Sequence, residues 1–251
     1  MKRRRPAAQS VDMSSKPKLK LDWCSHKAAK YAVEKWHYSK RMPVNKTVKI
    51  GVWEDGKYIG AVIFSCGSAG TASYGKRFGL RQTQTVELAR VALSEHKTEV
   101  SRIISIAMKM LRRQSPDLRL VVSYADENQN HIGSIYQAGN WIYVGQSAKD
   151  TAYIDTNGKV WHSRSVSKDG TKVHCGVRTS CPKIDDLEPV AIKQKWKYLY
   201  PLCQETSDKI EPLRKPYPKR ATSIGTDAPA THAGEGGANP TVALQTLRET
   251  G

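Results

Sequence analysis

Apolar side chains recur at helical spacing early in the chain and then alternate with polar ones. The helical stretch has four apolar residues at i, i+3, i+4 and i+7, namely Ala29, Ala32, Val33 and Trp36. Ser25 precedes this stretch as a helix cap, and the pattern ends near Tyr38. Residues 46–65 then alternate around Asp55-Gly56, a dipeptide typical of a tight hairpin. The pattern predicts one helix followed by two antiparallel strands.

A strand, a helix and a second strand are predicted next. Residues 85–93 have the composition of a third strand. The following stretch places five apolar residues on one helical face: Val100, Ile103, Ile104, Ala107 and Leu111. We expect this helix to begin after Thr98 as its cap and to stop at Ser115-Pro116. Residues 118–126 form an almost continuous apolar run, which indicates a central strand covered on both faces.

Shorter elements complete the order. Residues 132–138 predict a short helix that ends at Gly139 in the left-handed conformation. Residues 141–145 predict a strand, and residues 152–164 predict a hairpin around an Asn-Gly pair. Helices and strands thus alternate along the chain. We predict an α/β fold of the α+β type, a mixed central sheet with flanking helices.

The two ends of the chain differ from its middle in composition. Residues 1–20 are rich in Lys, Arg, Pro and Ser, which predicts a disordered basic arm. Residues 206–251 become a low-complexity tail of Gly, Ala, Thr and Pro. The middle, residues 21–205, has enough apolar residues for one folded domain. We therefore expect a single catalytic domain between two unstructured ends.

The net charge points to a polyanionic partner. The chain carries a formal charge of +18, of which residues 1–20 contribute +6 and residues 206–251 contribute +1, leaving +11 on residues 21–205. A basic folded body attracts DNA or RNA through counterion release, although a well-solvated surface would give the same charge. No apolar stretch approaches the roughly 20 residues that span a bilayer. The five cysteines are scattered without a CxxC pair, which favours a reducing cytoplasm.

The stretch YADENQNHIGSIYQAGNWIYVG, residues 124–145, gathers hydrogen-bonding side chains directly after the apolar run. Asn, Asp and Gly are ordinary turn residues, so a polar loop is one interpretation. The other is a binding site at the carboxyl end of a strand. The stretch itself leaves both open.

The order of elements resembles the acyltransferase fold of the GNAT superfamily, and particular segments narrow this resemblance. Six segments carry this narrower resemblance, in consistent order over about residues 34–202: WHYSKRMP, KIGVWEDGKYIGAVIF, YGKRFGLRQTQTVELARVAL, SRIISIAMKMLRR, RLVVSYADENQNHIGSIYQAGNWIYVG and KWKYLYPL. Together they closely resemble the Mom family of bacteriophage DNA-modification proteins. The resemblance implies an enzyme that converts adenine in phage DNA to N6-carbamoylmethyladenine, also called methylcarbamoyladenine, and so shields that DNA from host restriction. It also implies double-stranded DNA and a small-molecule group donor as partners, in the host cell cytoplasm. A homodimer is left open.

Arg90 lies in the middle of a predicted strand, where an apolar residue is expected. A buried guanidinium needs a partner such as Glu87, a substrate carboxylate or a phosphate. If the alternation holds, Glu87 and Arg90 point to opposite sides of the sheet, which favours a ligand. The resemblance assigns Arg90 the place of the family's essential arginine.

Four further residues fall in the family's functional set by local motif: His37, Tyr38, Asp126 and Tyr136. The resemblance makes iron a candidate cofactor, and an imidazole, a carboxylate and phenol oxygens form a plausible ligand set for Fe(II). One His and one Asp fall short of the usual two-His, one-carboxylate triad. Without metal, His37 or Asp126 could accept the proton of the adenine amine, and Tyr136 could donate one to a leaving group.

The stretch EHKTEVSRI stands where the superfamily binds the cofactor pyrophosphate at a helix N-terminus. It lacks the superfamily's glycine-rich loop. Ser101 could still donate from the first turn, with Arg102 and Lys97 as neutralising cations for an acyl-CoA-type donor. The alternative is an ordinary capped helix.

The sequence is also compatible with two other functions. One is a GNAT acyltransferase that acts on a protein or a small amine. The other is a non-catalytic nucleic-acid-binding protein, which the charge permits but which leaves Arg90 inside a strand without a purpose.

Overall fold

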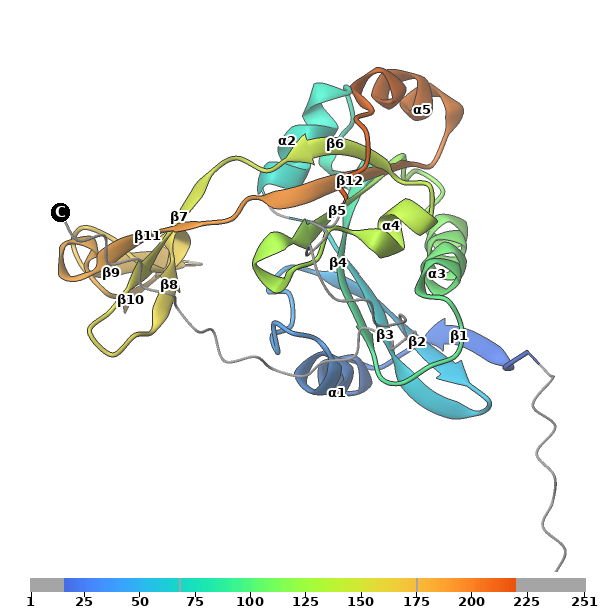
Figure 1. The fold of residues 1–251 in the computed structure, drawn as a ribbon, viewed down its shortest axis with the longest axis horizontal. Helices are drawn as coiled ribbons and strands as arrows, with labels where there is room; N and C mark the ends of the chain where they lie inside the picture. The colour runs from blue at the N-terminus through green and yellow to red at the C-terminus, as the bar shows by residue number, and fades with distance from the viewer. Residues whose placement is uncertain (1–15, 68, 175, 220–251) are drawn as a thin grey trace, which may run out of the picture.

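The computed structural model describes residues 16–67, 69–174 and 176–219. Its main sheet has seven strands in the order β1-β2-β3-β4-β5-β12-β6 (Figure 1). Only β4 and β5 run parallel among the paired neighbours of this sheet. The bounds are β1 Leu19–Trp23, β2 Thr47–Glu54, β3 Lys57–Ser65, β4 Thr85–Leu93, β5 Leu120–Asp126, β6 Ile142–Gln146 and β12 Lys195–Pro201. The predicted mixed sheet with flanking helices is confirmed.

Helices cover both faces of this sheet. The helices are α1 His26–Trp36, α2 Ala69–Arg77, α3 Val100–Gln114, α4 Ser134–Ala138 and α5 Gln204–Ile210. The apolar stripe of α3 and Tyr136 of α4 lie in the largest core, against one face. Residues of α1, and residues in and after α2 and α5, pack in two smaller clusters against the other face. We call these two sides the α3/α4 face and the α1/α2 face.

The local signals in the sequence predicted these elements well. The Ser25 hydroxyl oxygen accepts a hydrogen bond from the N–H of Ala28 at 3.2 Å, so it caps α1 as expected. The β2–β3 turn has Asp55 at φ 51° and Gly56 at φ 80°, the left-handed pair of a tight hairpin. The strands at residues 85–93 and 120–126 and the helix after residue 99 also lie where the pattern placed them.

Two predicted helix ends are wrong. Thr98 does not cap α3, which begins after Glu99, because the Thr98 hydroxyl donates to the carboxylate of Glu54 instead. Gly139 ends α4 at φ −92°, and the left-handed residue is its neighbour Asn140 at φ 57°. Asn tolerates this conformation better than most residues, which explains how the position shifts by one.

The expected chain ends fall partly outside the described residues. Residues 1–15 and 220–251 lie outside them. Within the described part, Leu19 and Lys20 already belong to β1, and α5 crosses the expected boundary at residue 205 with Thr206 and Ile210 buried. None of the described helices combines the length and hydropathy needed to cross a membrane.

The segment between β6 and β12 extends beyond the main sheet (Figure 1). It contains a three-stranded sheet in the order β11-β7-β8 and a separate β9–β10 hairpin. Their bounds are β7 Asp150–Ile154, β8 Val160–His162, β9 Thr171–His174, β10 Val177–Ser180 and β11 Glu188–Ile192. The predicted hairpin at residues 152–164 is β7–β8. Because β11 leads directly into β12, this extension ends at the central strands.

Candidate functional site

Strands β4 and β5 pair over Thr85–Glu87, and their ladder ends there. The pairing of β3 with β4 also shifts, since Ile63 pairs with Arg90 while its neighbour Phe64 pairs with Leu88. Ala89 is therefore the extra residue of a β-bulge. The bulge reverses the alternation, so Glu87 and Arg90 lie on the same α1/α2 face. The prediction that they point to opposite sides is wrong.

Arg90 is partly buried and bonds to backbone carbonyls. Its Nε donates to the Arg41 carbonyl at 3.2 Å, and an Nη donates to the Ala89 carbonyl at 2.7 Å. Within the described chain it forms no ion pair with a carboxylate. Among the described residues, the guanidinium is thus held next to the end of α1 by backbone carbonyls and not by an ion pair.

His37 follows α1 and is 8% exposed. Its Nδ1 accepts the Ser39 N–H at 3.0 Å and lies 2.8 Å from the Ser39 hydroxyl. Burial lowers the pKa of His37 to about 3, and the positive charges of Arg90, His131 and Lys40 add to the effect. The imidazole is therefore neutral at physiological pH. Because Nδ1 accepts a backbone N–H, the ring proton is on Nε2, which is a donor.

Tyr38 lies between His37 and the loop after β5. Its ring centroid is 4.3 Å from that of His37 and 5.5 Å from that of His131. Burial of the phenol raises its pKa, and the negative charge of Asp126 raises it further while Arg90 opposes the rise. Tyr38 therefore keeps its proton, although 43% of the residue is exposed.

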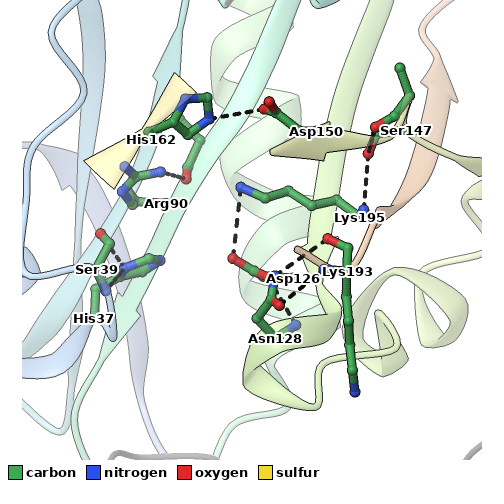
Figure 2. A network of polar contacts seen from close by, with 12 residues as sticks. His37, Ser39, Arg90, Asp126, Asn128, Ser147, Asp150, His162, Lys193 and Lys195 are labelled. Atoms are coloured by element: carbon green, nitrogen blue, oxygen red, sulfur yellow. Dashed lines mark hydrogen bonds and ion pairs between the residues drawn. The ribbon is translucent and has the colours of Figure 1, made fainter. Parts of the chain in front are cut away.

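Asp126 ends β5 and organises the loop that follows. Its Oδ1 accepts the N–H of Asn128 at 3.1 Å and the Asn128 side-chain amide at 3.0 Å. Its Oδ2 lies 3.7 Å from the ammonium of Lys195 on the neighbouring strand. Figure 2 shows this ion pair on one side of the view and Arg90 and His37 on the other. Asn128 in turn accepts the N–H of Lys193, so part of the polar stretch forms the turn itself.

Tyr136 reaches the same region from the α3/α4 face. The residue is 7% exposed, and its hydroxyl is 2.8 Å from the Ser123 hydroxyl, which is 2.9 Å from the Leu88 carbonyl. The carbonyl can only accept, so Ser123 donates to it and Tyr136 donates to Ser123. Burial raises the pKa of Tyr136 to about 12. Its protonated hydroxyl therefore lies where β4 and β5 stop pairing.

The four tentative metal ligands do not fit a metal ion in this arrangement. Nδ1 of His37 is occupied by Ser39, and binding through Nε2 would require that nitrogen to lose its proton. Both phenols keep their protons, and Asp126 is already in contact with Lys195 and Asn128. In the part of the chain that the structure describes, no three His, Cys, Asp or Glu residues are grouped closely enough to hold a metal. These four residues are therefore not assigned as iron ligands.

The loop before α3 binds a carboxylate of the protein itself. The Glu54 carboxylate, in a residue 8% exposed, accepts the N–H groups of Lys97 and Thr98, each at 2.8 Å, and the Thr98 hydroxyl at 2.6 Å. Burial alone would raise the pKa of Glu54, but these hydrogen bonds together lower it. A donor phosphate at this place would have to use the first turn of α3, at Ser101, with the exposed cations of Lys97 and Arg102.

Sequence reasoning missed two residues of this region. Ser123 links Tyr136 to β4, and Lys195 pairs with Asp126. A serine inside an otherwise apolar run was the available signal for the first. The second depends on β12 lying next to β5, which no local pattern indicated.

Comparison of the sequence with known proteins shows the family of this chain. The model of the Mom protein family matches residues 18–219. The chain belongs to the Mom protein family. It is 28% identical over 163 residues to the methylcarbamoylase Mom of Escherichia phage Mu, a match that covers 63% of this chain and 66% of that protein. Among solved structures it is similar to a Bacillus subtilis acetyltransferase in complex with CoA, with 13% identity and a TM-score of 0.42, over 75% of this chain and 100% of that one.

Membership in the Mom family confirms the resemblance stated from the six sequence segments. The matched region, residues 18–219, coincides closely with the described fold and extends past the expected boundary at residue 205. It therefore includes β1 and α5 as parts of the Mom-type domain.

Proposed function

We propose that this protein is a DNA-modifying transferase that converts adenine in phage DNA to N6-carbamoylmethyladenine and thereby protects that DNA from host restriction. The observation that carries the proposal is the Mom family match over residues 18–219. The fold supports it, because the residues that the resemblance selected lie around the point where β4 and β5 separate.

The candidate catalytic residues have distinct roles in this proposal. Tyr136 is a protonated, buried phenol suited to donating a proton to a leaving group, for which its O–H would turn from the Ser123 hydroxyl to that group. His37 is neutral and presents its Nε2 proton as a hydrogen-bond donor. Asp126 remains as the acceptor for the proton of the adenine amine. Its contact with Lys195 fixes the position of the carboxylate until then.

Arg90 and Tyr38 complete the set on the α1/α2 face. Arg90 supplies a positive charge that no carboxylate of the described chain neutralises, so it is available to an anionic or carbonyl oxygen of the substrate. Tyr38 presents a partly exposed aromatic ring beside His37, which suits contact with a base.

A small-molecule donor of the acyl-CoA type is part of the proposal. When bound, such a donor would supply carbon atoms of the added group. Lys97, Ser101 and Arg102 are the residues that would hold its phosphates at the start of α3. Because Glu54 already occupies the amides of Lys97 and Thr98, we expect a contact built on side-chain cations and the first helical turn.

Double-stranded DNA is the proposed substrate, in the host cell cytoplasm, and assembly as a homodimer stays a prediction. The +11 charge on residues 21–205 suits binding to the phosphate backbone. The amine of adenine is engaged in base pairing inside a duplex, so the base must be extruded to reach Tyr136 and Asp126.

Mass spectrometry of nucleosides tests the function. The chain and its Tyr136→Phe variant are expressed with a plasmid, and the plasmid DNA is digested and analysed. Lys57→Met is the matched control, because Lys57 is exposed beside the β2–β3 turn. We expect deoxyadenosine heavier by one carbamoylmethyl group with the wild type and the control, and little or none with Tyr136→Phe. Unaltered deoxyadenosine with abundant, folded wild-type protein would contradict the proposal.

A further inference from the structure

Lys197, in the middle of β12, is a nearly buried cation. The residue is 9% exposed, and its ammonium lies 4.0 Å from the centroid of the Tyr74 ring on α2. Throughout the described residues, no carboxylate lies within ion-pair distance of this ammonium. Lysines are rarely this buried unless they are paired, because an unneutralised charge loses its hydration. The contact with one aromatic ring offsets only part of that loss.

The strand register places Lys197 next to the candidate site. Lys197 pairs with Tyr124 of β5, two residues before the pair formed by Lys195 and Asp126. Residues two apart on a strand share a face, so Lys197 lies on the α1/α2 face with Asp126. Arg90 of β4 is on this face too, because of the β4 bulge. Tyr124 therefore stands between two strands that each carry a cation.

Both cations lie at irregularities of the sheet. The pairing of β12 with β6 shifts register between Lys197 and Tyr198, and the pairing of β3 with β4 skips Ala89 next to Arg90. Bulges re-aim side chains and are common beside active sites. The bulge in β4 re-aims Arg90. Beside Lys197 the extra residue is Val144 of β6, and β12 itself stays regular against β5, so Lys197 reaches the same face by ordinary alternation.

Charged residues of both signs lie near Tyr124, the neighbour of Lys197 on strand β5. Arg164, in the short helix Ser163–Ser165 after β8, acts electrostatically on the Tyr124 phenol, so a third cation is near this row. Glu87 is a carboxylate on the same face, and its Oε2 accepts the Thr71 hydroxyl at 2.7 Å. This carboxylate has partners of its own within the chain. The Tyr124 phenol is therefore near charges of both signs, the Glu87 carboxylate from β4 and the Arg164 guanidinium from the extension.

We propose that Lys197, seated on Tyr74, binds a phosphodiester of the DNA strand beside the adenine that is modified. This proposal rests on the proposed function and adds a substrate-binding residue to it. An extruded nucleotide brings its own phosphates toward the enzyme, and an ammonium is a compact donor to such a group. The proposed donor-binding residues lie at the start of α3, which packs on the opposite face, so the α1/α2 face is left to the nucleotide.

A neutral-phosphate experiment tests the contact. Fluorescence anisotropy measures binding of a duplex with one mismatched adenine, either with normal phosphates or with a methylphosphonate at one of the phosphates flanking that adenine. The proteins are the wild type, Lys197→Met, Lys197→Arg and the control Lys57→Met. Lys197→Met keeps the apolar stem and removes the charge. The control removes one exposed charge from a distant hairpin.

The expected results form a double-mutant cycle. Lys197→Met weakens binding of the normal duplex by roughly 10- to 100-fold, the range of a charge-assisted hydrogen bond. One of the flanking methylphosphonates weakens binding by the wild type by a similar factor, and it does not weaken Lys197→Met further. Lys197→Arg keeps most of the affinity, and Lys57→Met changes it by less than about threefold. Circular dichroism confirms that each variant is folded.

Other outcomes overturn the proposal in distinguishable ways. If a flanking methylphosphonate weakens binding by Lys197→Met by the same factor as binding by the wild type, Lys197 does not contact the phosphate. The same holds if Lys197→Met binds the normal duplex as the wild type does. If Lys197→Met weakens binding of free deoxyadenosine as much as binding of the duplex, Lys197 reads the base instead. In both cases the proposed function stands. If the folded wild type binds no DNA at all, the proposed function fails together with this inference.

Discussion

Glu54 and Lys197 are two nearly buried charged residues of the same sheet, at 8% and 9% exposure. The Glu54 carboxylate accepts two backbone N–H groups and one hydroxyl, all within 2.8 Å. The ammonium of Lys197 has one described contact, the face of the Tyr74 ring. The first charge is satisfied by its own chain. The second has no ion-pair partner among residues 16–67, 69–174 and 176–219, and the proposed DNA phosphate would supply one.

This difference indicates a structural role for Glu54 and a substrate-binding role for Lys197. Glu54 ties β2 to the loop before α3, and so it fixes the start of the longest helix. It also occupies amides that an external phosphate would otherwise use. Lys197 lies across the sheet from α3, among Arg90, Tyr124 and Asp126. The DNA phosphate is therefore expected on the α1/α2 face, and the donor phosphates are expected at the first turn of α3, beside the loop that Glu54 occupies.

The largest expected effect is the loss of activity in Arg90→Ala. Arg90 lies on the α1/α2 face, as Lys197 does. Its described hydrogen bonds go to backbone carbonyls and not to a carboxylate. Removing it should lower the yield of modified deoxyadenosine by about 100-fold or more while the fold is kept. Arg90→Lys should restore little, because an ammonium cannot reproduce the planar guanidinium contacts. Nucleoside mass spectrometry measures the yield. Full activity in Arg90→Ala would show that an unpaired cation here is not functional.

The next largest effect concerns stability at Glu54. Glu54→Ala leaves two N–H groups and a hydroxyl without their acceptor, so the free energy of unfolding should fall by about 2–4 kcal/mol. Glu54→Gln should cost less, because it keeps one acceptor oxygen. Urea denaturation measures both. Since the pKa of Glu54 is lowered by folding, its contribution is present above the unfolded pKa and is lost as the pH falls through the folded value. Unchanged stability in Glu54→Ala would contradict the structural role of Glu54.

His37 is intermediate between Glu54 and Lys197, because the N–H of Ser39 makes a hydrogen bond with one of its two ring nitrogens. Its folded pKa of about 3 is below the unfolded value near 6.5, so the unfolded chain binds the proton more readily. This residue should therefore lower stability by about 2 kcal/mol as the pH falls from 7 to 5. His37→Asn should lose that part of the pH dependence. Urea denaturation of both proteins at the two pH values measures it, and parallel curves would contradict the burial of a neutral imidazole.

The smallest expected effect is the change of stability in Lys197→Met. Replacing a buried, unneutralised ammonium by an apolar side chain of similar length should change the free energy of unfolding by less than about 1 kcal/mol, or stabilise the fold. Thermal unfolding measures this against the wild type. A strong destabilisation would mean that Lys197 has a structural partner, as Glu54 does.

Local signals made much of this fold predictable from the sequence. The Ser25 cap, the Asp55-Gly56 turn and the apolar stripe of α3 each depend on residues within one or two turns of one another. Candidate residues such as Tyr136 and Asp126 followed from motif resemblance, and the structure places them near the end of the β4–β5 ladder.

What could not be predicted depends on contacts far apart in the chain. The place of β12 between β5 and β6 joins Lys195 to Asp126, and Glu54 meets Thr98 across 44 positions. The bulge at Ala89 has no sequence signal, yet it sets the direction of Arg90. The alternation rule failed there for that reason. The ion pair of Lys195 and Asp126 in the candidate site, and the buried Lys197 beside it, depend on the sheet order.

The most direct test compares Glu54→Gln with Lys197→Met in one experiment. Both variants remove one buried charge and keep the size of the side chain. Plasmid DNA from cells that express each variant, at matched levels of folded protein, is analysed for the modified nucleoside. We predict that Glu54→Gln keeps the modified deoxyadenosine and that Lys197→Met loses most of it. The opposite result, or equal yields from both, would contradict the claim that the unsatisfied cation on the α1/α2 face receives the substrate.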